Sequence, residues 1–186
     1  MIVTVWWEDA RQPVRSKNYG PDQFLARCIA DDLGCDLKDA LRMFSGQPKK
    51  GAGTIKRLLT DEAPLVLNRG PLCAVLDHDK ILELWLPTER PNDCHSGICG
   101  AIRSASPGDY YLVLLHENME TLVRAACDVM HVDVPAKSPQ TRDDILARLV
   151  FGESSEKRQI VRDAVPGFNR LVDWVKAVVA QPTPSL

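Results

Sequence analysis

The stretch Leu72-Cys73-Ala74-Val75-Leu76 decides the fold class, because it is apolar at every position and runs directly into Asp77-His78-Asp79. A strand buried on both faces has such a continuous apolar run, whereas a strand with one face in water alternates apolar and polar residues. Strands of the first kind are typical of parallel sheets that lie between layers of helices. The stretch therefore predicts a central strand of an α/β domain.

Two further segments are expected to pair with this strand. Residues 2–7 are β-branched, apolar and aromatic, and the run stops at Glu8-Asp9. Residues 110–115 form another apolar run. We expect the three strands to lie side by side in a small parallel or mixed sheet with helices on both faces.

The segments between these strands carry helix and loop signals. Pro21 should open a helix that runs to about Leu33, and Gly34 should end it. Residues 36–48 are ambiguous, and Leu41 to Phe44 within them fit either a strand or a helical turn. Lys49 to Thr54 has the composition of a basic loop, with Thr54 as a possible cap for the next helix. The stretch from 88 to 100 is expected to be a loop, because it is rich in Pro, Asn, Asp, Ser and Gly.

The last fifty residues are expected to be helical. Apolar side chains recur at helical spacing from Phe168 onwards and predict a helix over 168–180 that buries Phe168, Leu171, Val172, Val175 and Val179. We therefore divide the chain into an α/β domain over residues 1–135 and a helical extension over 136–186 that packs on it.

The amino-acid composition and charge limit the classes of protein to which the chain can belong. Of the 186 residues, 45% are hydrophobic and 26% are charged, which suits a globular domain with a real core. The formal net charge of −2 gives no general basic field, so charge alone does not suggest tight nonspecific binding to nucleic acid. No apolar segment is long enough to cross a bilayer, and the start lacks the features of a secretory signal. With six cysteines expected to be reduced, we expect a cytoplasmic protein with no membrane partner.

Acidic residues follow all three predicted strands. Glu8 follows the first, Asp77 and Asp79 follow the second, and Glu117 and Glu120 follow the third. The carboxyl ends of parallel strands meet at one edge of a sheet, where open α/β folds bind their ligands. Carboxylates are the ligands that Mg²⁺ prefers, and a separate glutamate can move a proton. The alternative is that each acid caps or begins a helix, where the helix dipole favours it.

Two other motifs are weaker. The glycine-containing stretch from Gly46 to Thr54 is not a P-loop, because Ala52 stands where the phosphate-binding lysine must be. Lys49 and Lys50, beside a helix N-terminus, remain candidates for holding a phosphate. Cys94-His95 and Cys99 have the residue types of a zinc site, but no fourth partner at fitting spacing appears.

The chain resembles the Toprim domain, which topoisomerases, primases and nucleases of the overcoming-lysogenization-defect type share. The resemblance is carried by Val-Thr-Val-Trp-Trp-Glu8, by Cys-Ala-Val-Leu-Asp77-His-Asp79, and by Leu-Val-Leu-Leu-His-Glu117-Asn-Met-Glu120. The last of these, and the tail from Lys137 to Val175, are similar to small stand-alone Toprim-like proteins of bacteria and phages. One position departs, since Asp9 stands where Toprim domains usually have glycine.

The resemblance implies a Mg²⁺- or Mn²⁺-dependent phosphoryl-transfer protein or nuclease, acting on nucleic acid in bacterial or phage defence. Glu8 would be the general acid or base, and Asp77 and Asp79 the metal ligands. Glu117 and Glu120, at the end of the third strand, are further candidate metal ligands. The alternative is a degenerate, non-catalytic Toprim-like module that docks on a partner protein such as an ATPase. The arrangement of the acids distinguishes the two, because only an enzyme must bring Glu8 close to the two aspartates.

Overall fold

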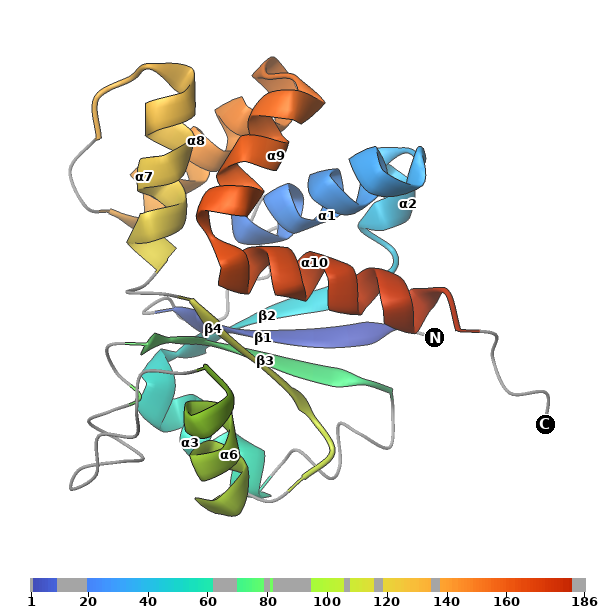
Figure 1. The fold of residues 1–186 in the computed structure, drawn as a ribbon, viewed down its shortest axis with the longest axis vertical. Coiled ribbons are helices and arrows are strands. Elements are labelled where there is room, and N and C mark those ends of the chain that lie inside the picture. Colours follow the sequence, from blue (N-terminus) through green and yellow to red (C-terminus); the bar gives the residue numbers. More distant parts are fainter. Residues whose placement is uncertain are drawn as a thin grey trace.

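The computed structural model describes residues 2–9, 20–61, 70–78, 81, 95–105, 108–115, 119–134 and 138–181. These residues form a four-stranded sheet of order β2-β1-β3-β4, which lies between two helical layers of unequal size (Figure 1). All neighbouring strands in it are parallel. The strands are β1 (Val3–Asp9), β2 (Phe44–Lys50), β3 (Leu72–Asp77) and β4 (Tyr111–Leu115).

The central position predicted for residues 72–76 is confirmed. Thr4 of β1 pairs with Leu72, and Cys73 pairs with Tyr111 of β4. The five apolar residues of β3 are all buried, since the strand is covered on both faces. Cys73 and Val75 belong to the core of the larger helical layer, while Leu72, Ala74 and Leu76 belong to the core of the smaller one. The α/β class, the three predicted strands and their parallel order are therefore correct.

The strand β2 replaces the loop that was expected at Lys49 and Lys50. It contains Pro48, which cannot donate a hydrogen bond to a sheet, and this is tolerated because β2 lies at the edge and pairs only with β1. The chain then turns at Gly51, whose φ of +74° is accessible to glycine at little cost, and begins α3 (Gly51–Asp61). Thr54 is not a cap of this helix, because it lies inside the helix and its hydroxyl donates to the carbonyl of Lys50.

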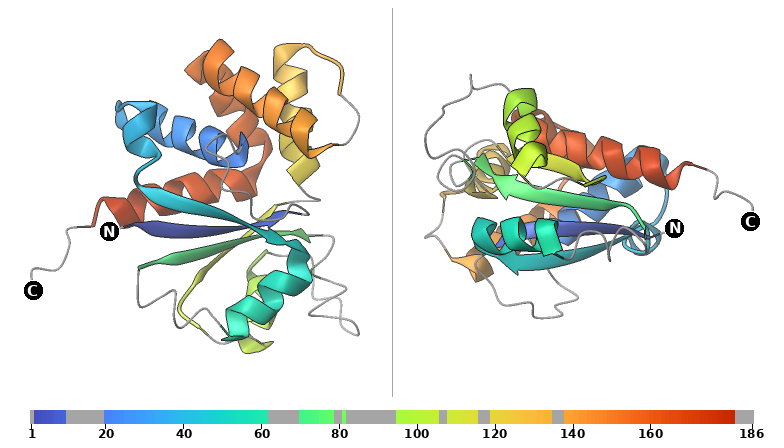
Figure 2. Two further views of the ribbon diagram at one scale, coloured as in Figure 1. Left: turned by 180° about the vertical axis from the view of Figure 1, so that it is seen from behind. Right: turned by 90° about the horizontal axis from the view of Figure 1, so that it is seen from below.

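Helices cover both faces of the sheet (Figure 2). The smaller layer contains α3 and α6 (His95–Ala105). The loop that was expected over residues 88–100 is therefore wrong from His95 onwards. The polar and small residues of that stretch hid a helix in which Ile98, Cys99 and Ile102 are buried against the sheet. The larger layer contains α1 (Gly20–Leu33), α2 (Leu37–Ala40), α7 (Met119–Met130), α8 (Pro139–Gly152), α9 (Ser155–Ala164) and α10 (Pro166–Val179).

The C-terminal helices share one core with the sheet. Phe168 of α10 stacks on Phe24 of α1, with ring centroids 4.9 Å apart. The expected stripe is buried at Phe168, Leu171, Val172 and Val175, but Val178 takes the place of Val179. The domain boundary near residue 135 stays a prediction.

Among the described residues, no helix has both the length and the apolarity needed to cross a membrane.

Candidate functional site at the carboxyl ends of β1 and β3

The strands β1 and β3 stop pairing before either of them ends. Their last paired residues are Trp7 and Val75, although β1 continues to Asp9 and β3 to Asp77. On its other side β1 stays paired with β2 as far as Asp9 and Lys50. The chain also changes direction here, since β1 leads outwards to β2 and β3 leads outwards to β4. Open α/β sheets bind their ligands at such a switch point.

Glu8 spans the gap between these two strands. One carboxylate oxygen accepts a hydrogen bond from the backbone N–H of Ala52, at 3.0 Å, and the other accepts one from the backbone N–H of Asp77, at 2.9 Å. Glu8 is buried, so both bonds are made in a setting where an unpaired carboxylate would be costly. Because Ala52 lies in the first turn of α3, Glu8 occupies the place that a bound anion takes at a helix N-terminus.

Asp77 meets Glu8 through its backbone, and its side chain has a different direction. Successive side chains of a strand point to opposite faces of the sheet. Trp6 belongs to the core of the smaller layer, so Glu8, two residues later in β1, lies on the face of the sheet that α3 covers. Val75 belongs to the core of the larger layer, so Asp77, two residues later in β3, lies on the opposite face. The strand ends at Asp77, and His78 is already helical.

The other predicted metal ligands are not gathered around Glu8 in the part of the chain that the structure describes. Asp79 and Glu117 lie outside the described residues, and Glu120 is an exposed residue in the first turn of α7, where the helix dipole favours a carboxylate. Among the described side chains, no group of three or more His, Cys, Asp or Glu is placed to hold a metal ion. The ligand set Asp77, Asp79, Glu117 and Glu120 therefore stays a prediction.

Lys49 and Lys50 end the edge strand beside Glu8. In the register of the sheet, Lys49 is the partner of Glu8 and Lys50 is the partner of Asp9. The ammonium group of Lys49 lies 5.1 Å from the centre of a Trp6 ring, within the range of a cation–π interaction, and Lys50 is exposed. Since Glu8 already takes the N–H of Ala52, a phosphate here would be held by the lysine side chains rather than by that amide.

One carboxyl group at this end of the sheet escaped the sequence analysis. Asp22 follows Pro21 in the first turn of α1, where an acid is ordinary, but its Oδ1 accepts a hydrogen bond of 2.7 Å from the indole of Trp7. Burial raises the pKa of Asp22 from 3.8 to about 7, while the bond from Trp7 lowers it. No spacing in the sequence links these two residues, which lie fifteen positions apart.

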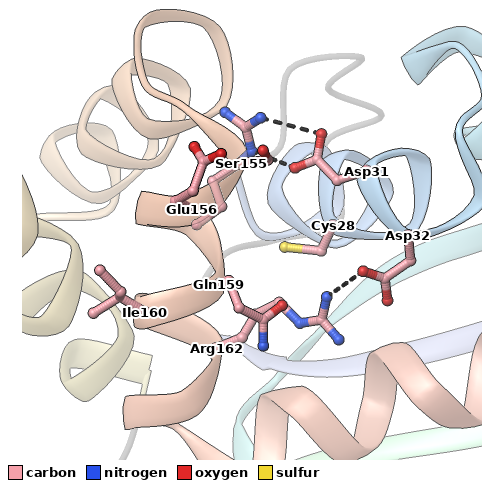
Figure 3. Close-up of a pocket in the computed structure, with 9 residues that line it drawn as sticks. Cys28, Asp31, Asp32, Ser155, Glu156, Gln159, Ile160 and Arg162 are labelled. Atoms are coloured by element: carbon pink, nitrogen blue, oxygen red, sulfur yellow. Dashed lines mark hydrogen bonds and ion pairs between the residues drawn. The ribbon is translucent and has the colours of Figure 1, made fainter.

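A second feature is a pocket of about 390 Å³ between α1 and α9, lined by Cys28, Asp31, Asp32, Ser155, Glu156, Arg158, Gln159, Ile160 and Arg162 (Figure 3). Both arginines of the pocket already have carboxylate partners that also line it, since Arg158 pairs with Asp31 and Arg162 pairs with Asp32. The guanidinium groups are therefore already neutralised by carboxylates, and the pocket is not built to take an anionic ligand.

Comparison with known proteins assigns the chain to no family, so the candidate site is described from its geometry alone. No family model, no curated protein and no solved structure matches the chain.

Proposed function

We propose that the chain is a Toprim-like, divalent-metal-dependent phosphoryl-transfer protein whose reaction centre lies where β1 and β3 part. The observation that carries the proposal is the position of Glu8, a buried carboxylate that spans the switch point of a parallel sheet. Lys49 and Lys50 lie on the neighbouring strand, which supports a substrate that carries phosphate. Nucleic acid is the proposed substrate, and a nuclease acting in bacterial or phage defence is the proposed role.

The proposed roles follow from the chemistry of each side chain. Asp77 and Asp79, with Glu117 and Glu120, would hold Mg²⁺ or Mn²⁺, since hard cations take carboxylate oxygens. When bound, such an ion stabilises charge on the attacking and leaving oxygens. Glu8 is a buried carboxylate whose two oxygens accept the backbone N–H groups of Ala52 and Asp77. It is proposed to exchange a proton with the substrate, while Lys49 and Lys50 orient the phosphate.

A second candidate is a non-catalytic module that docks on a partner protein such as an ATPase. The observation that favours it is the same pair of backbone bonds at Glu8, because a carboxylate that ties α3 to β3 has a structural task without any chemistry. The direction of Asp77 towards the opposite face of the sheet also favours it. The two candidates differ in whether the native protein binds a metal ion at Asp77.

Added Mg²⁺ or Mn²⁺ should raise the melting temperature of the wild-type protein. An ion that binds only the native state at ten times its Kd stabilises it by about 1.4 kcal/mol. Asp77→Asn should lose most of this gain, because it removes a ligand. Glu8→Gln should keep the gain but lose phosphodiester cleavage. Its metal-free stability should fall by about 1–3 kcal/mol, since the new amide NH₂ must face one of the two backbone N–H groups. Thermal melts across millimolar ion, with a cleavage assay, measure these effects.

The matched control is Asp163→Asn, which changes an exposed carboxylate on α9 far along the chain from the site. It should keep the full metal-dependent gain. If the wild type shows no gain at millimolar ion, or if Asp77→Asn shows the same gain, the enzyme proposal fails and the interaction module becomes the better account.

A further inference from the structure

Asp22 joins the start of α1 to the two strands beneath it. Its Oδ1 accepts the hydrogen bond from Trp7 of β1, at 2.7 Å. Its carboxyl group also lies directly over Gly46 of β2, so closely that a Cβ atom added to Gly46 would come within 1.8 Å of Oδ1 and 2.1 Å of Oδ2. A side chain at position 46 would occupy the space of this carboxyl group, so Asp22 would have to move away from Trp7 and β2. Three segments that are distant in sequence therefore meet at one titratable group.

The surroundings of Asp22 favour the neutral form of its carboxyl group. The indole of Trp7 is fully buried, and the part-buried carboxyl of Asp22 lies between it and Gly46. Burial raises the pKa of Asp22 to about 7, although the hydrogen bond from Trp7 and the N-terminal position in α1 both favour the charged form. Loss of solvation thus outweighs the stabilising partners, and the group changes charge near neutral pH.

Among the residues that the structure describes, charged groups near Asp22 do not account for its raised pKa. On α8, Arg142 and Asp143 face the same end of α1, with Asp143 packed against Gly20, and these two form an ion pair of 3.6 Å with each other. At the far end of α1, Asp31 pairs with Arg158 of α9, and Asp32 pairs with Arg162 of α9 and with Lys176 of α10. On β1, Glu8 projects from the opposite face of the sheet, towards α3.

We propose that Asp22, Trp7 and Gly46 form a proton-dependent clasp, which holds the N-terminus of α1 on β1 and β2 while Asp22 is neutral and loosens it when Asp22 ionises. The clasp lies one residue from Glu8 along β1, so its opening changes the support of the switch point. The inference rests on Asp22 and its contacts and does not depend on metal binding or catalysis.

The direction of the pH dependence follows from the raised pKa. Unfolded, Asp22 titrates near 3.8, and in the native state it titrates at about 7. Its favourable contribution is fully present below the unfolded pKa and is lost as the pH rises from about 4 to about 7. A shift of this size corresponds to a change of about a thousand-fold in the unfolding equilibrium constant across that window.

Asp22→Asn is the main test, because asparagine keeps the acceptor for Trp7 and cannot ionise. Thermal melts of the wild type and the variant at pH 4.5 to 8.5 should agree closely at the acid end and diverge as the pH rises, with the variant more stable at pH 8. Hydrogen exchange should show that the amides of residues 24–27, which bond to the carbonyls of the first turn of α1, lose protection in the wild type over the same window, while α10 does not. Other titrating groups cancel in the comparison, because both proteins carry them.

Two further variants make the test specific. Trp7→Phe removes the N–H that favours the charged form, so the midpoint of the divergence should move to higher pH, whatever the change in overall stability. Asp39→Asn, an exposed carboxylate of α2, should leave the pH profile of the wild type unchanged. A difference between wild type and Asp22→Asn that is the same at every pH, or protection lost equally in α1 and α10, overturns the clasp.

Discussion

Replacing Gly167 by alanine should destabilise the protein by about 3 kcal/mol or more, which is at the upper end for adding one methyl group to a packed core. Gly167 is buried in the first turn of α10 and rests on the backbone of β4. A Cβ atom there would lie 2.1 Å from the carbonyl oxygen of Leu114 and 3.0 Å from its carbon. A strand backbone held in a sheet cannot move aside as a flexible side chain can, so α10 must lift from the sheet. That displacement would also disturb the stacking of Phe168 on Phe24.

The measurement is urea unfolding, in which the midpoint should fall sharply while the m-value stays the same. Gly53→Ala in α3 is the matched control, because nothing lies within 4 Å of the added Cβ atom and its φ is not in the left-handed region. Alanine should stabilise that helix by up to about 1 kcal/mol. If the two variants unfold at similar urea concentrations, α10 does not pack on β4 as described.

The fold was predictable where one physical signal dominates. The apolar run from Leu72 to Leu76 can be satisfied only by burial on both faces, and this gave the central strand and the parallel class. β2 was left open between a strand and a helical turn, and its end was expected to be a loop, because an edge strand is only partly buried and carries no clear apolar pattern. Pro48 also indicates a loop unless the edge position is known. The helix from His95 was missed because Ser96, Gly97 and Gly100 are typical of loops, and only the sheet beneath them makes the helix stable.

For the candidate site, the strand ends that form it were predictable from the sequence, but the contacts within it were not. Parallel strands must bring their carboxyl ends together, so the closeness of Glu8 to Asp77 followed from the strand assignments. The hydrogen bonds that fix Glu8 did not follow, because they come from the backbone of Ala52 and Asp77, which carries no side-chain signature. The environment of Asp22 was hidden for the same reason, since it depends on how α1 lies over Gly46.

The larger helical layer also contains a buried ion-pair network that no periodic pattern in the sequence predicts. Arg158 of α9 is 2% exposed and binds Asp31 of α1 through two bonds, Nε to Oδ2 at 2.6 Å and Nη2 to Oδ1 at 3.1 Å. Its Nη1 donates to the carbonyl of Leu149, at 3.2 Å, and to that of Glu153. These carbonyls lie at the end of α8, where backbone acceptors lack helical partners and a cation is favoured. One guanidinium group therefore joins three helices.

Arg158→Met should destabilise the protein by about 3–5 kcal/mol, because it keeps an apolar stem but leaves Asp31 and the carbonyls at the end of α8 without their buried partner. The loss should stay within this range, since Arg27 remains 3.2 Å from Asp31 at a more exposed position. Lys157→Ala is the neighbouring control. It removes a half-exposed cation that pairs with Glu153 at 2.7 Å, and it should change stability by less than about 1 kcal/mol.

The double variant Asp31→Leu with Arg158→Met separates an ionic network from general damage to packing. Replacing both charges of a buried pair by apolar groups removes the unpaired carboxylate, so most of the lost stability should return. Thermal and urea unfolding of the wild type, Asp31→Leu, Arg158→Met and the double variant give the coupling free energy between Asp31 and Arg158. If the double variant is as unstable as Arg158→Met, or if Lys157→Ala is equally damaging, the stability of this helical layer does not depend on the Arg158–Asp31 pair. If it recovers, the pair acts chiefly by fixing how α1, α8 and α9 meet. The sheet with Glu8 and Asp22 then rests on helices whose arrangement is set by charge as well as by the apolar core.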